Sequence, residues 1–284
     1  MILFPNAKIN LGLDILRKRA DGYHDIDTVM YPVPWCDILE IVPSRQDTTS
    51  LTVTGRAVGC PEEKNLVMRA YRAIEKEAGS IPPVDIFLHK VIPDGAGLGG
   101  GSSDAAFTLK ALNDMFNLGF TQEKLEHIAS GIGADCPFFI RNTPAFASGT
   151  GTTLEHIDME WPIQFDIAII KPEVSVNTRQ AYSAVKPGIP EHPLREIVSG
   201  NDTKNILPLI KNDFEASVFP VFPEISYIKE RLLSLDSIKA SYAAMSGSGS
   251  AVFALCDKSI GSDKLAEIIS SEFPDASTFA APLG

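Results

Sequence analysis

The sequence predicts an α+β fold. Roughly the first 60 residues carry runs typical of β-strands, and helical and strand-like segments alternate over the rest of the chain. With 284 residues, 44% of them hydrophobic, the chain can bury a sizeable core as one large domain or as two smaller ones. No internal repeat or low-complexity linker marks a domain boundary.

Two strand-like runs open the chain, AKINLGLDIL at 7–16 and DTVMYPV at 27–33. The polar turn RKRADGYHD between them predicts a hairpin. The segment at 65–78 then places its apolar residues on one helical face. Asn65 is suited to cap the start of this helix and Gly79 to end it.

A strand, a glycine-rich loop and a helix are predicted next. VDIFLHKVI at 84–92 is typical of a strand, and PDGAGLGGGSSDAA at 93–106 leads into a helix that we expect from about Ser103 to Asn117. A further helix is expected near 122–130, directly before the segment GIGADCPFFI.

The second half of the chain is expected to begin near residue 159, which gives domains of 1–158 and 159–284. It contains a strand, FDIAIIKP, then helical patches up to Leu235 and the strand-loop-strand pattern ASYAAMSGSGSAVFALC. A helix near Lys264 and a final strand complete it. Residues 186–205, rich in proline and charge, are expected to form a surface segment.

Composition and charge exclude several classes of function. The net charge of −11 and the pI near 4.9 argue against a general grip on nucleic acid or anionic membranes, so any anion site must be local. The four cysteines form no C-x-x-C pair, which favours reduced thiols. The N-terminus lacks the pattern of a signal peptide, and no segment is apolar enough to span a membrane, so we expect a cytoplasmic protein.

The glycine-rich loop indicates a phosphate site, because glycines let backbone N–H groups approach an anion and the helix start adds its positive end. A Walker A loop would need a lysine after the last glycine, where this chain has Ser102. A dinucleotide loop, to which Gly95, Gly97 and Gly100 conform, would need an acidic residue at the end of a following strand, but a helix follows instead. A tight glycine turn with a serine cap is the structural alternative.

Three stretches together resemble the GHMP kinase superfamily. PDGAGLGGGSS at 93–103 resembles its second motif, and AAMSGSGSAVFAL at 243–255 is similar to its third glycine motif. PNAKINLGLDILRKRADGYHDIDTVMYPV at 5–33 resembles the opening of the branch that acts on a cytidylylated methylerythritol. The combination of KINL with RADGYH is far more specific than any glycine pattern.

The resemblance implies a two-domain fold and a reaction. The N-terminal domain should be similar to a domain of ribosomal protein S5, and the C-terminal domain should be ferredoxin-like. The expected reaction uses ATP and Mg²⁺ to phosphorylate the 2-hydroxyl of 4-diphosphocytidyl-2-C-methyl-D-erythritol, in the non-mevalonate route to isoprenoid precursors. We expect a small-molecule substrate, no nucleic-acid or membrane partner, and a monomer or homodimer. The metal ligands are left open.

Two residues are expected to carry the chemistry. The resemblance assigns Asp135 as the base that accepts the proton of the attacking hydroxyl, with Lys8 beside it to stabilise developing charge. Without the resemblance, Asp135 could equally cap the helix that begins near Pro137, and Lys8 would be a solvated strand lysine. Asn10 falls on the same strand face as Lys8 and is expected to bind the substrate.

Tyr23 and His24, at the tip of the first turn, are implied to recognise cytosine. An aromatic ring stacks on a pyrimidine and an imidazole hydrogen-bonds its edge. Thr178 and Tyr182 are also assigned to the substrate, although a buried helix tyrosine explains Tyr182 equally well.

The remaining expected residues share a role in binding ATP. They are Asn65, Leu66, Lys90, Pro93, Gly97, Leu98, Gly99, Gly100, Gly101, Ser102 and Ser103. Gly247 and Gly249 are expected to let the second glycine loop come close to this site, with a hairpin turn as the alternative.

Other functions stay open at this level. A GHMP kinase for a mevalonate-like or homoserine-like alcohol should lack the RADGYH turn. A non-catalytic nucleotide-binding module or a nucleic-acid-binding domain would not need Lys8 with Asp135, and the acidic charge also argues against the latter. A dinucleotide-dependent oxidoreductase is the third alternative.

Overall fold

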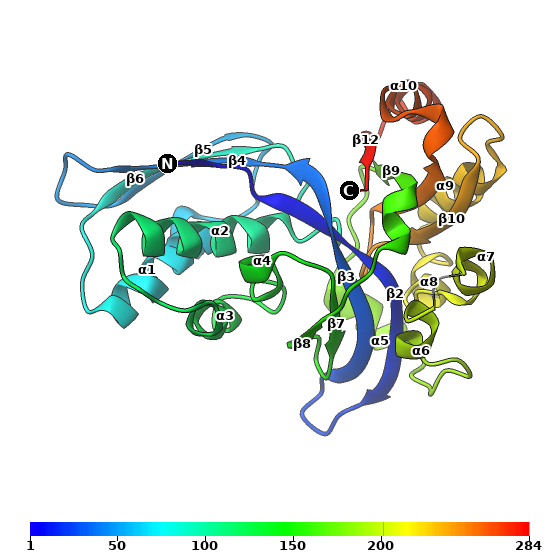
Figure 1. Ribbon diagram of the computed structural model, residues 1–284, viewed down its shortest axis with the longest axis horizontal. Coiled ribbons are helices and arrows are strands. Elements are labelled where there is room, and N and C mark those ends of the chain that lie inside the picture. The colour runs from blue at the N-terminus through cyan, green and yellow to red at the C-terminus, as the bar shows by residue number, and fades with distance from the viewer. Residues whose placement is uncertain (201, 284) are drawn as a thin grey trace. The chain divides into compact units, whose positions relative to one another are not determined.

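The computed structural model describes residues 1–200 and 202–283, and the chain forms two compact units. The first unit contains Met1–Lys8, Trp35–Asp94 and Gly99–Thr143, and the second contains Ile9–Pro34, Gly95–Leu98 and Pro144–Gly284. Sheets and helices occur in both, which confirms the α+β class (Figure 1). Because each unit combines segments that are distant in sequence, the boundary at residue 158 stays a prediction.

The first unit is built on a sheet with the strand order β1-β4-β6-β5. These strands are β1 (Ile2–Leu3), β4 (Ile38–Pro43), β5 (Ser50–Gly55) and β6 (Val84–Lys90). β6 pairs antiparallel with β4 and parallel with β5. Alternate residues of β6 are buried from Val84 through Ile86 and Leu88, so the strand period places Lys90 on the buried face as well.

Helices cover one face of this sheet (Figure 1). They are α1 (Leu66–Ala78), α2 (Gly100–Met115), α3 (Gln122–Ser130) and α4 (Phe138–Arg141), with a 3₁₀ turn at Glu62–Lys64. The predicted α1 is confirmed, and the side chain of Asn65 accepts the N–H of Val67 at 2.9 Å as its cap.

The helix expected from about Ser103 begins three residues earlier, at Gly100. Gly99 precedes it with a φ of 72°, in the left-handed region that favours glycine. Gly100 and Gly101 therefore belong to the first helical turn, and their N–H groups are among those that no helical carbonyl can satisfy. The backbone of the glycine loop is thus the start of α2 itself.

The second unit contains two antiparallel sheets. One has the order β2-β3-β7-β8, made from β2 (Asn6–Lys18), β3 (His24–Cys36), β7 (Ala145–Ser148) and β8 (Thr153–His156). The other has the order β10-β11-β9-β12, made from β9 (Phe165–Lys171), β10 (Ala240–Met245), β11 (Val252–Asp257) and β12 (Ser277–Pro282). The predicted N-terminal hairpin and the strand-loop-strand at 240–256 are confirmed.

Helices of the second unit surround its core, which includes the fully buried Leu232 and Phe214. They are α5 (Thr178–Ala184), α6 (Leu194–Val198), α7 (Thr203–Ile206), α8 (Glu215–Val218), α9 (Pro223–Ser234) and α10 (Ser262–Glu272), with 3₁₀ turns at Trp161–Gln164, Leu207–Leu209 and Lys258–Ile260.

The segment 186–205 is only partly a surface segment. Ile189 is 91% exposed, as expected, but Leu194 is buried, and its Cδ1 lies 2.5 Å from the place where a Cβ on Gly12 would be. An apolar residue on α6 therefore packs against β2, which corrects the expectation for that part of the segment. Residue 201 lies outside the described residues.

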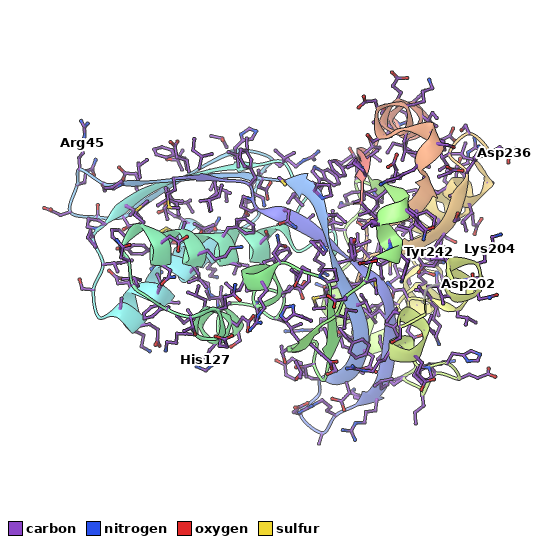
Figure 2. The ribbon with its side chains drawn as sticks, in the orientation of Figure 1. Arg45, His127, Asp202, Lys204, Asp236 and Tyr242 are labelled. Carbon is purple, nitrogen blue, oxygen red and sulfur yellow. The ribbon has the colours of Figure 1, made fainter. Side chains whose placement is uncertain are left out.

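Arg45 and His127 lie at the periphery of the first unit. Figure 2 shows Arg45, on the connection between β4 and β5, directed away from the sheet, and His127 of α3 directed away from the rest of the first unit. Over residues 1–200 and 202–283, no helix combines the length and the apolar character needed to cross a membrane.

Candidate functional site

The first unit brings Lys8 and Asp135 together. The Lys8 ammonium lies 3.3 Å from Oδ2 of Asp135, and the exposed fractions of the two side chains are 4% and 32%. Lys8 comes from β2, and Asp135 comes from the loop between α3 and α4. A buried cation therefore faces a carboxylate that solvent or a substrate can reach, as proton abstraction from a hydroxyl requires.

The start of α2 packs directly against this pair. A Cβ added to Gly99 would lie 3.2 Å from Cγ of Lys8 and 2.9 Å from the ring of Phe139. Only glycine fits there without displacing either side chain, and its left-handed φ makes the same demand. The N-terminal end of α2, with its positive dipole end and free N–H groups, therefore lies next to the Lys8–Asp135 pair.

The two serines of the loop continue this arrangement. A Cβ on Gly133, two residues before Asp135, would lie 3.8 Å from the hydroxyl oxygen of Ser102. Ser103 is fully buried, and its hydroxyl has no hydrogen-bond partner among the described residues. A buried hydroxyl without a partner costs free energy, which a bound phosphate or its metal would recover.

The residues expected near the adenine also belong to the first unit. A Cβ on Gly101 would lie 3.6 Å from Cδ1 of Leu66. Asn65 is buried and caps α1, so the capping role given as its alternative is confirmed. Pro93 is buried just before the loop. Contact of these residues with ATP stays a prediction.

Lys90 does not point into solvent. Its side chain is 6% exposed, and its ammonium lies between the carboxylates of Asp37 and Asp104. Burial by itself would lower the pKa of Lys90, but the neighbouring Asp104 and Asp37 raise it. Lys90 therefore stays charged within a buried cluster behind the loop.

In the second unit, the earlier part of the loop packs on the other glycine motif. A Cβ on Gly97 would lie 2.0 Å from the carbonyl oxygen of Ser246, and the Ser246 hydroxyl donates to the carbonyl oxygen of Gly97 at 2.9 Å. The amide of Ala251 donates to the carbonyl of Ala96 at 3.1 Å. Two glycine-containing loops thus meet backbone to backbone, while the side chain of Leu98 is fully buried.

Asn10 and Thr178 also contact this second glycine motif. The backbone N–H of Asn10 donates to the Ser246 hydroxyl at 3.3 Å, and its side-chain amide donates to Thr28 at 2.9 Å. The hydroxyls of Thr178 and Ser248 are 3.0 Å apart. These contacts fix Asn10 and Thr178, and their binding of substrate stays a prediction.

An aromatic cluster contains two of the residues expected to recognise cytosine. The rings of His24 and Tyr182 are stacked with centroids 5.0 Å apart and planes at 17°, and Tyr182 meets Phe214 edge-on at 4.8 Å. The structure thus brings together His24 and Tyr182, which lie 158 positions apart in the chain. The ring of Tyr23, by contrast, is 67% exposed.

Burial lowers the pKa of His24, and the positive charge of Lys18 lowers it further. Its imidazole is therefore neutral at pH 7, with one nitrogen donating and the other accepting. The edge of cytosine offers a donor and acceptors, so a neutral imidazole suits its recognition.

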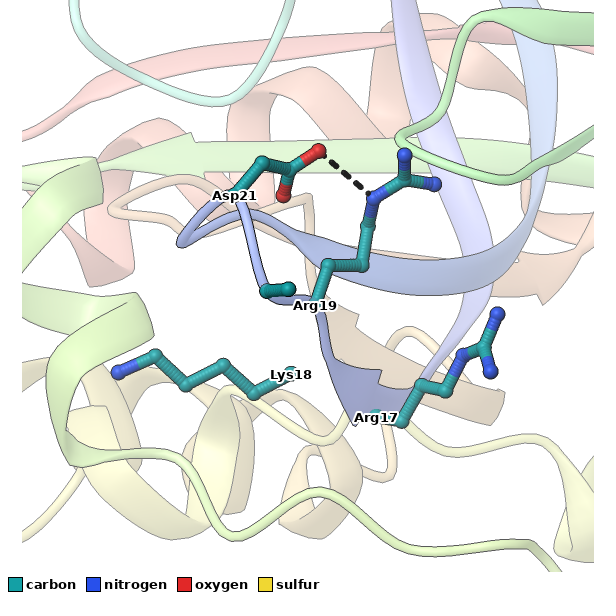
Figure 3. A pocket seen from close by; sticks show the side chains of 5 residues that line it. Arg17, Lys18, Arg19 and Asp21 are labelled. Atoms are coloured by element: carbon teal, nitrogen blue, oxygen red, sulfur yellow. Dashed lines mark hydrogen bonds and ion pairs between the residues drawn. The ribbon is translucent and has the colours of Figure 1, made fainter.

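The hairpin beside His24 carries three basic side chains, of which Arg17 and Arg19 both form ion pairs with Asp25. A cavity of about 420 Å³ is lined by Arg17, Lys18, Arg19, Ala20 and Asp21. Figure 3 shows the Arg19–Asp21 ion pair, with an N–O distance of 3.1 Å, and Lys18 and Arg17 pointing in opposite directions. Arg17, Lys18 and Arg19 stand against Asp21 and Asp25, which leaves this turn with a formal charge of +1 in a chain of net charge −11.

Sequence reasoning missed two anchoring residues. Asp37 is fully buried and binds Lys90, and Asn212, 3% exposed, donates to the carbonyls of Met245 at 2.7 Å and Gly247 at 2.8 Å. Neither belongs to a recognisable motif. Asp37 is a polar residue between apolar neighbours, whereas Asn212 stands between Lys211 and Asp213, and neither context reveals the partner of the side chain.

No group of three or more His, Cys, Asp or Glu side chains in the described part of the chain is arranged to hold a metal ion. Magnesium in phosphoryl-transfer sites is commonly held by one or two protein groups together with substrate phosphates and water. The unpartnered Ser103 hydroxyl at the start of α2 fits that donor set.

Two family models match the chain. GHMP kinases N terminal domain matches residues 65–143, and GHMP kinases C terminal matches residues 194–275. Among curated relatives, a 4-diphosphocytidyl-2-C-methyl-D-erythritol kinase from Parabacteroides distasonis is 52% identical over 264 residues, which cover 91% of this chain and 92% of the relative. The Bacteroides fragilis protein of the same name is 49% identical, with 90% and 92% covered.

Solved structures agree with these relatives. A crystal structure of 4-(cytidine 5'-diphospho)-2C-methyl-D-erythritol kinase superposes with a TM-score of 0.83 at 32% identity, covering 99% of this chain and 98% of the other. A homoserine kinase from Cytophaga hutchinsonii gives 0.68 at 19% identity, covering 97% and 93% of the two chains, and shows the fold alone.

The close approach of Gly97 to Ser246 yields a prediction. Gly97→Ala forces a methyl group against a backbone carbonyl in a left-handed conformation, and we expect the free energy of unfolding to fall by about 3 kcal/mol in urea denaturation. Gly95→Ala is the matched control, since Gly95 also has a left-handed φ of 61° but its Cβ would meet only the Ser175 hydroxyl, at 3.8 Å. The free energy of unfolding of Gly95→Ala should fall by about 1 kcal/mol. An equal fall in the two variants would contradict the proposed clash at Gly97.

Proposed function

Because the chain belongs to the GHMP kinase family, among the 4-diphosphocytidyl-2-C-methyl-D-erythritol kinases, we propose that it phosphorylates 4-diphosphocytidyl-2-C-methyl-D-erythritol. ATP supplies the phosphoryl group, and the 2-hydroxyl of the methylerythritol accepts it. The reaction is a step in the non-mevalonate formation of isoprenoid precursors. We further propose that the protein works in the cytoplasm as a monomer or homodimer.

The single observation that carries this proposal is the Lys8–Asp135 pair beside the N-terminal end of α2. Phosphoryl transfer depends on positioning and on stabilising charge, with little covalent work for the protein. The three parts that it needs are a base for the hydroxyl, a cation and a phosphate-binding backbone. All three lie in one compact unit.

The residues then have distinct roles. Asp135 takes the proton of the 2-hydroxyl, and the Lys8 ammonium stabilises the negative charge that develops on that oxygen. The N–H groups at the start of α2 and the hydroxyls of Ser102 and Ser103 bind the ATP phosphates. Mg²⁺, when bound with ATP, neutralises charge on the phosphates, and the Ser103 hydroxyl is the residue that would hold it.

Cytosine recognition is proposed for the cluster of His24 and Tyr182, with Tyr23 closing over the base. Stacking on an aromatic ring gives affinity for any pyrimidine, and the neutral imidazole gives a choice of hydrogen bonds. Lys18, which lines the cavity at this hairpin, favours the approach of an anionic diphosphate. Mevalonate and homoserine contain no cytosine, so they would make no contact with the aromatic cluster of His24 and Tyr182.

The first test offers the purified protein ATP and Mg²⁺ with each of three alcohols: 4-diphosphocytidyl-2-C-methyl-D-erythritol, mevalonate and homoserine. We expect ADP and a phosphorylated product from the first alone, because only it presents a cytosine to the His24 cluster. Transfer to mevalonate or homoserine without transfer to the cytidylyl compound would overturn the substrate assignment and leave the kinase activity intact.

Replacing the proposed base gives a second test. Asp135→Asn keeps the shape of the side chain but cannot accept the proton, so kcat should fall by about 10²- to 10⁴-fold while ATP binding by calorimetry stays within about two-fold. Asp114→Asn, which removes an exposed carboxylate from α2, is the control and should keep the wild-type rate. Near-normal turnover of Asp135→Asn would contradict the role of Asp135 as the base.

The His24 environment gives a pH prediction. Because the pKa of His24 lies below its ordinary value of 6.5, its imidazole is mainly neutral between pH 8 and pH 6.5, and KM for the cytidylyl substrate should change little over that range. KM should rise only at lower pH, once the imidazole becomes protonated. His24→Ala should raise KM for this substrate more than KM for ATP. Equal changes in both constants would count against a role in reading the base.

A further inference from the structure

Three charged residues form a buried cluster in the first unit, distinct from the Lys8–Asp135 pair. Asp37 lies between β3 and β4, Lys90 is the last residue of β6, and Asp104 is the fifth residue of α2. The exposed fractions of their side chains are 0%, 6% and 3%. Neither the alcohol chemistry nor the recognition of cytosine uses this cluster.

Lys90 links the other two residues. Its ammonium donates to Oδ2 of Asp104 at 2.7 Å and to Oδ2 of Asp37. The second oxygen of Asp37 accepts the backbone N–H groups of Val91 at 2.5 Å and Ile92 at 2.8 Å. The end of β6 and the start of α2 are thereby fixed to each other through one ammonium group.

Stability alone does not account for such a cluster. Removing charges from water is expensive, and well-packed hydrophobic residues in place of a buried ion pair are often equally stable. Burial raises the pKa of Asp104, although the ammonium of Lys90 opposes the shift. Beyond stability, the cluster fixes the orientation of the groups that it joins, because charged hydrogen bonds hold their partners in one geometry.

The element that it fixes is the proposed phosphate-binding turn. A Cβ on Gly100 would lie 3.3 Å from the Lys90 ammonium and 3.0 Å from Cγ2 of Ile92. Gly100 therefore packs against Lys90 and Ile92, both of which hydrogen-bond to Asp37. These contacts support the first turn of α2 on the side that faces the sheet.

We propose that Lys90 is a positioning residue, which acts through its hydrogen bond to Asp104 to hold the first turn of α2 in the orientation that binds the polyphosphate of ATP. The inference rests on the proposed function, because it takes this turn to be the phosphate site. Asp37 holds the Lys90 ammonium in place, and Gly100 packs against that ammonium. The hydrogen bond from Lys90 to Asp104 connects the ammonium to α2.

Two substitutions at one position test the inference. Asp104→Ala and Asp104→Asn remove the same negative charge, but only asparagine keeps an oxygen that can accept from Lys90. Both leave Lys90 paired with Asp37, so no buried ammonium is stranded. We expect calorimetry to give a Kd for ATP about ten-fold higher in Asp104→Ala and within about three-fold of wild type in Asp104→Asn.

The direction of the change in the Kd for ATP distinguishes the loss of the Lys90–Asp104 hydrogen bond from the loss of a negative charge. Removing a carboxylate near a phosphate site would tighten the binding of ATP if charge alone mattered, and it would do so in both variants. Equal affinities in the two variants, or tighter binding in Asp104→Ala, would overturn the inference.

A control on the same helix excludes general loss of structure. Asn113 holds the far end of α2 by accepting the N–H of Phe120 at 3.0 Å, so Asn113→Ala should lower the urea midpoint without raising the Kd for ATP. The Kd for the cytidylyl substrate should stay within about two-fold of wild type in every variant. A parallel loss of both affinities in Asp104→Ala would show a structural role only and reject the inference.

The measurement is independent of turnover. If the wild-type protein binds ATP but phosphorylates none of the offered alcohols, the proposed substrate is wrong, while the comparison of the two Asp104 variants still decides the role of Lys90. If the alcohol is phosphorylated and the two variants bind ATP equally, the function stands and the inference is wrong.

Discussion

The contact of Gly99 with Lys8 and Phe139 is the constraint on which the candidate site depends. A side chain at this position would occupy the space of the Lys8 stem and of the phenyl ring. Its absence allows the free N–H groups of α2 to lie beside the Lys8–Asp135 pair. The glycine also takes the left-handed conformation that starts the helix at this point. This one residue therefore permits both the start of α2 at this point and its close approach to the Lys8–Asp135 pair.

Local charge explains how an acidic protein can bind two anionic substrates. The net charge of the chain is −11, and most of the cations near the candidate site have carboxylate partners. Lys8 pairs with Asp135, Lys90 lies between Asp37 and Asp104, and Arg17 and Arg19 both pair with Asp25. The N–H groups at the start of α2 therefore supply positive potential that no carboxylate of these pairs cancels, and they act over the short range at which a phosphate would bind.

The two halves of the first glycine motif are held in place by different contacts. The segment up to Leu98 is held by the backbone of the SGSGS loop, through Gly97 and Ser246, and Asn212 holds that loop in turn. The segment from Gly99 is part of a helix and is held by Lys8, Phe139 and Ile92. The glycine-rich segment from Gly95 to Gly101 is therefore held by two sets of contacts. A side chain would meet a backbone carbonyl at Gly97 and the Lys8 and Phe139 side chains at Gly99.

The sequence by itself determined the α+β class, most strands and helices, the glycine loop before a helix, and the family, because hydrophobic period and motif spacing are local properties of the chain. It also suggested Lys8 with Asp135, although only through resemblance. The tertiary structure decided that α2 begins at Gly100, that His24 stacks on Tyr182, and that Lys90 lies between Asp37 and Asp104. These pairings join residues up to 158 positions apart. No local pattern specifies them, since they depend on which strand and helix faces pack together.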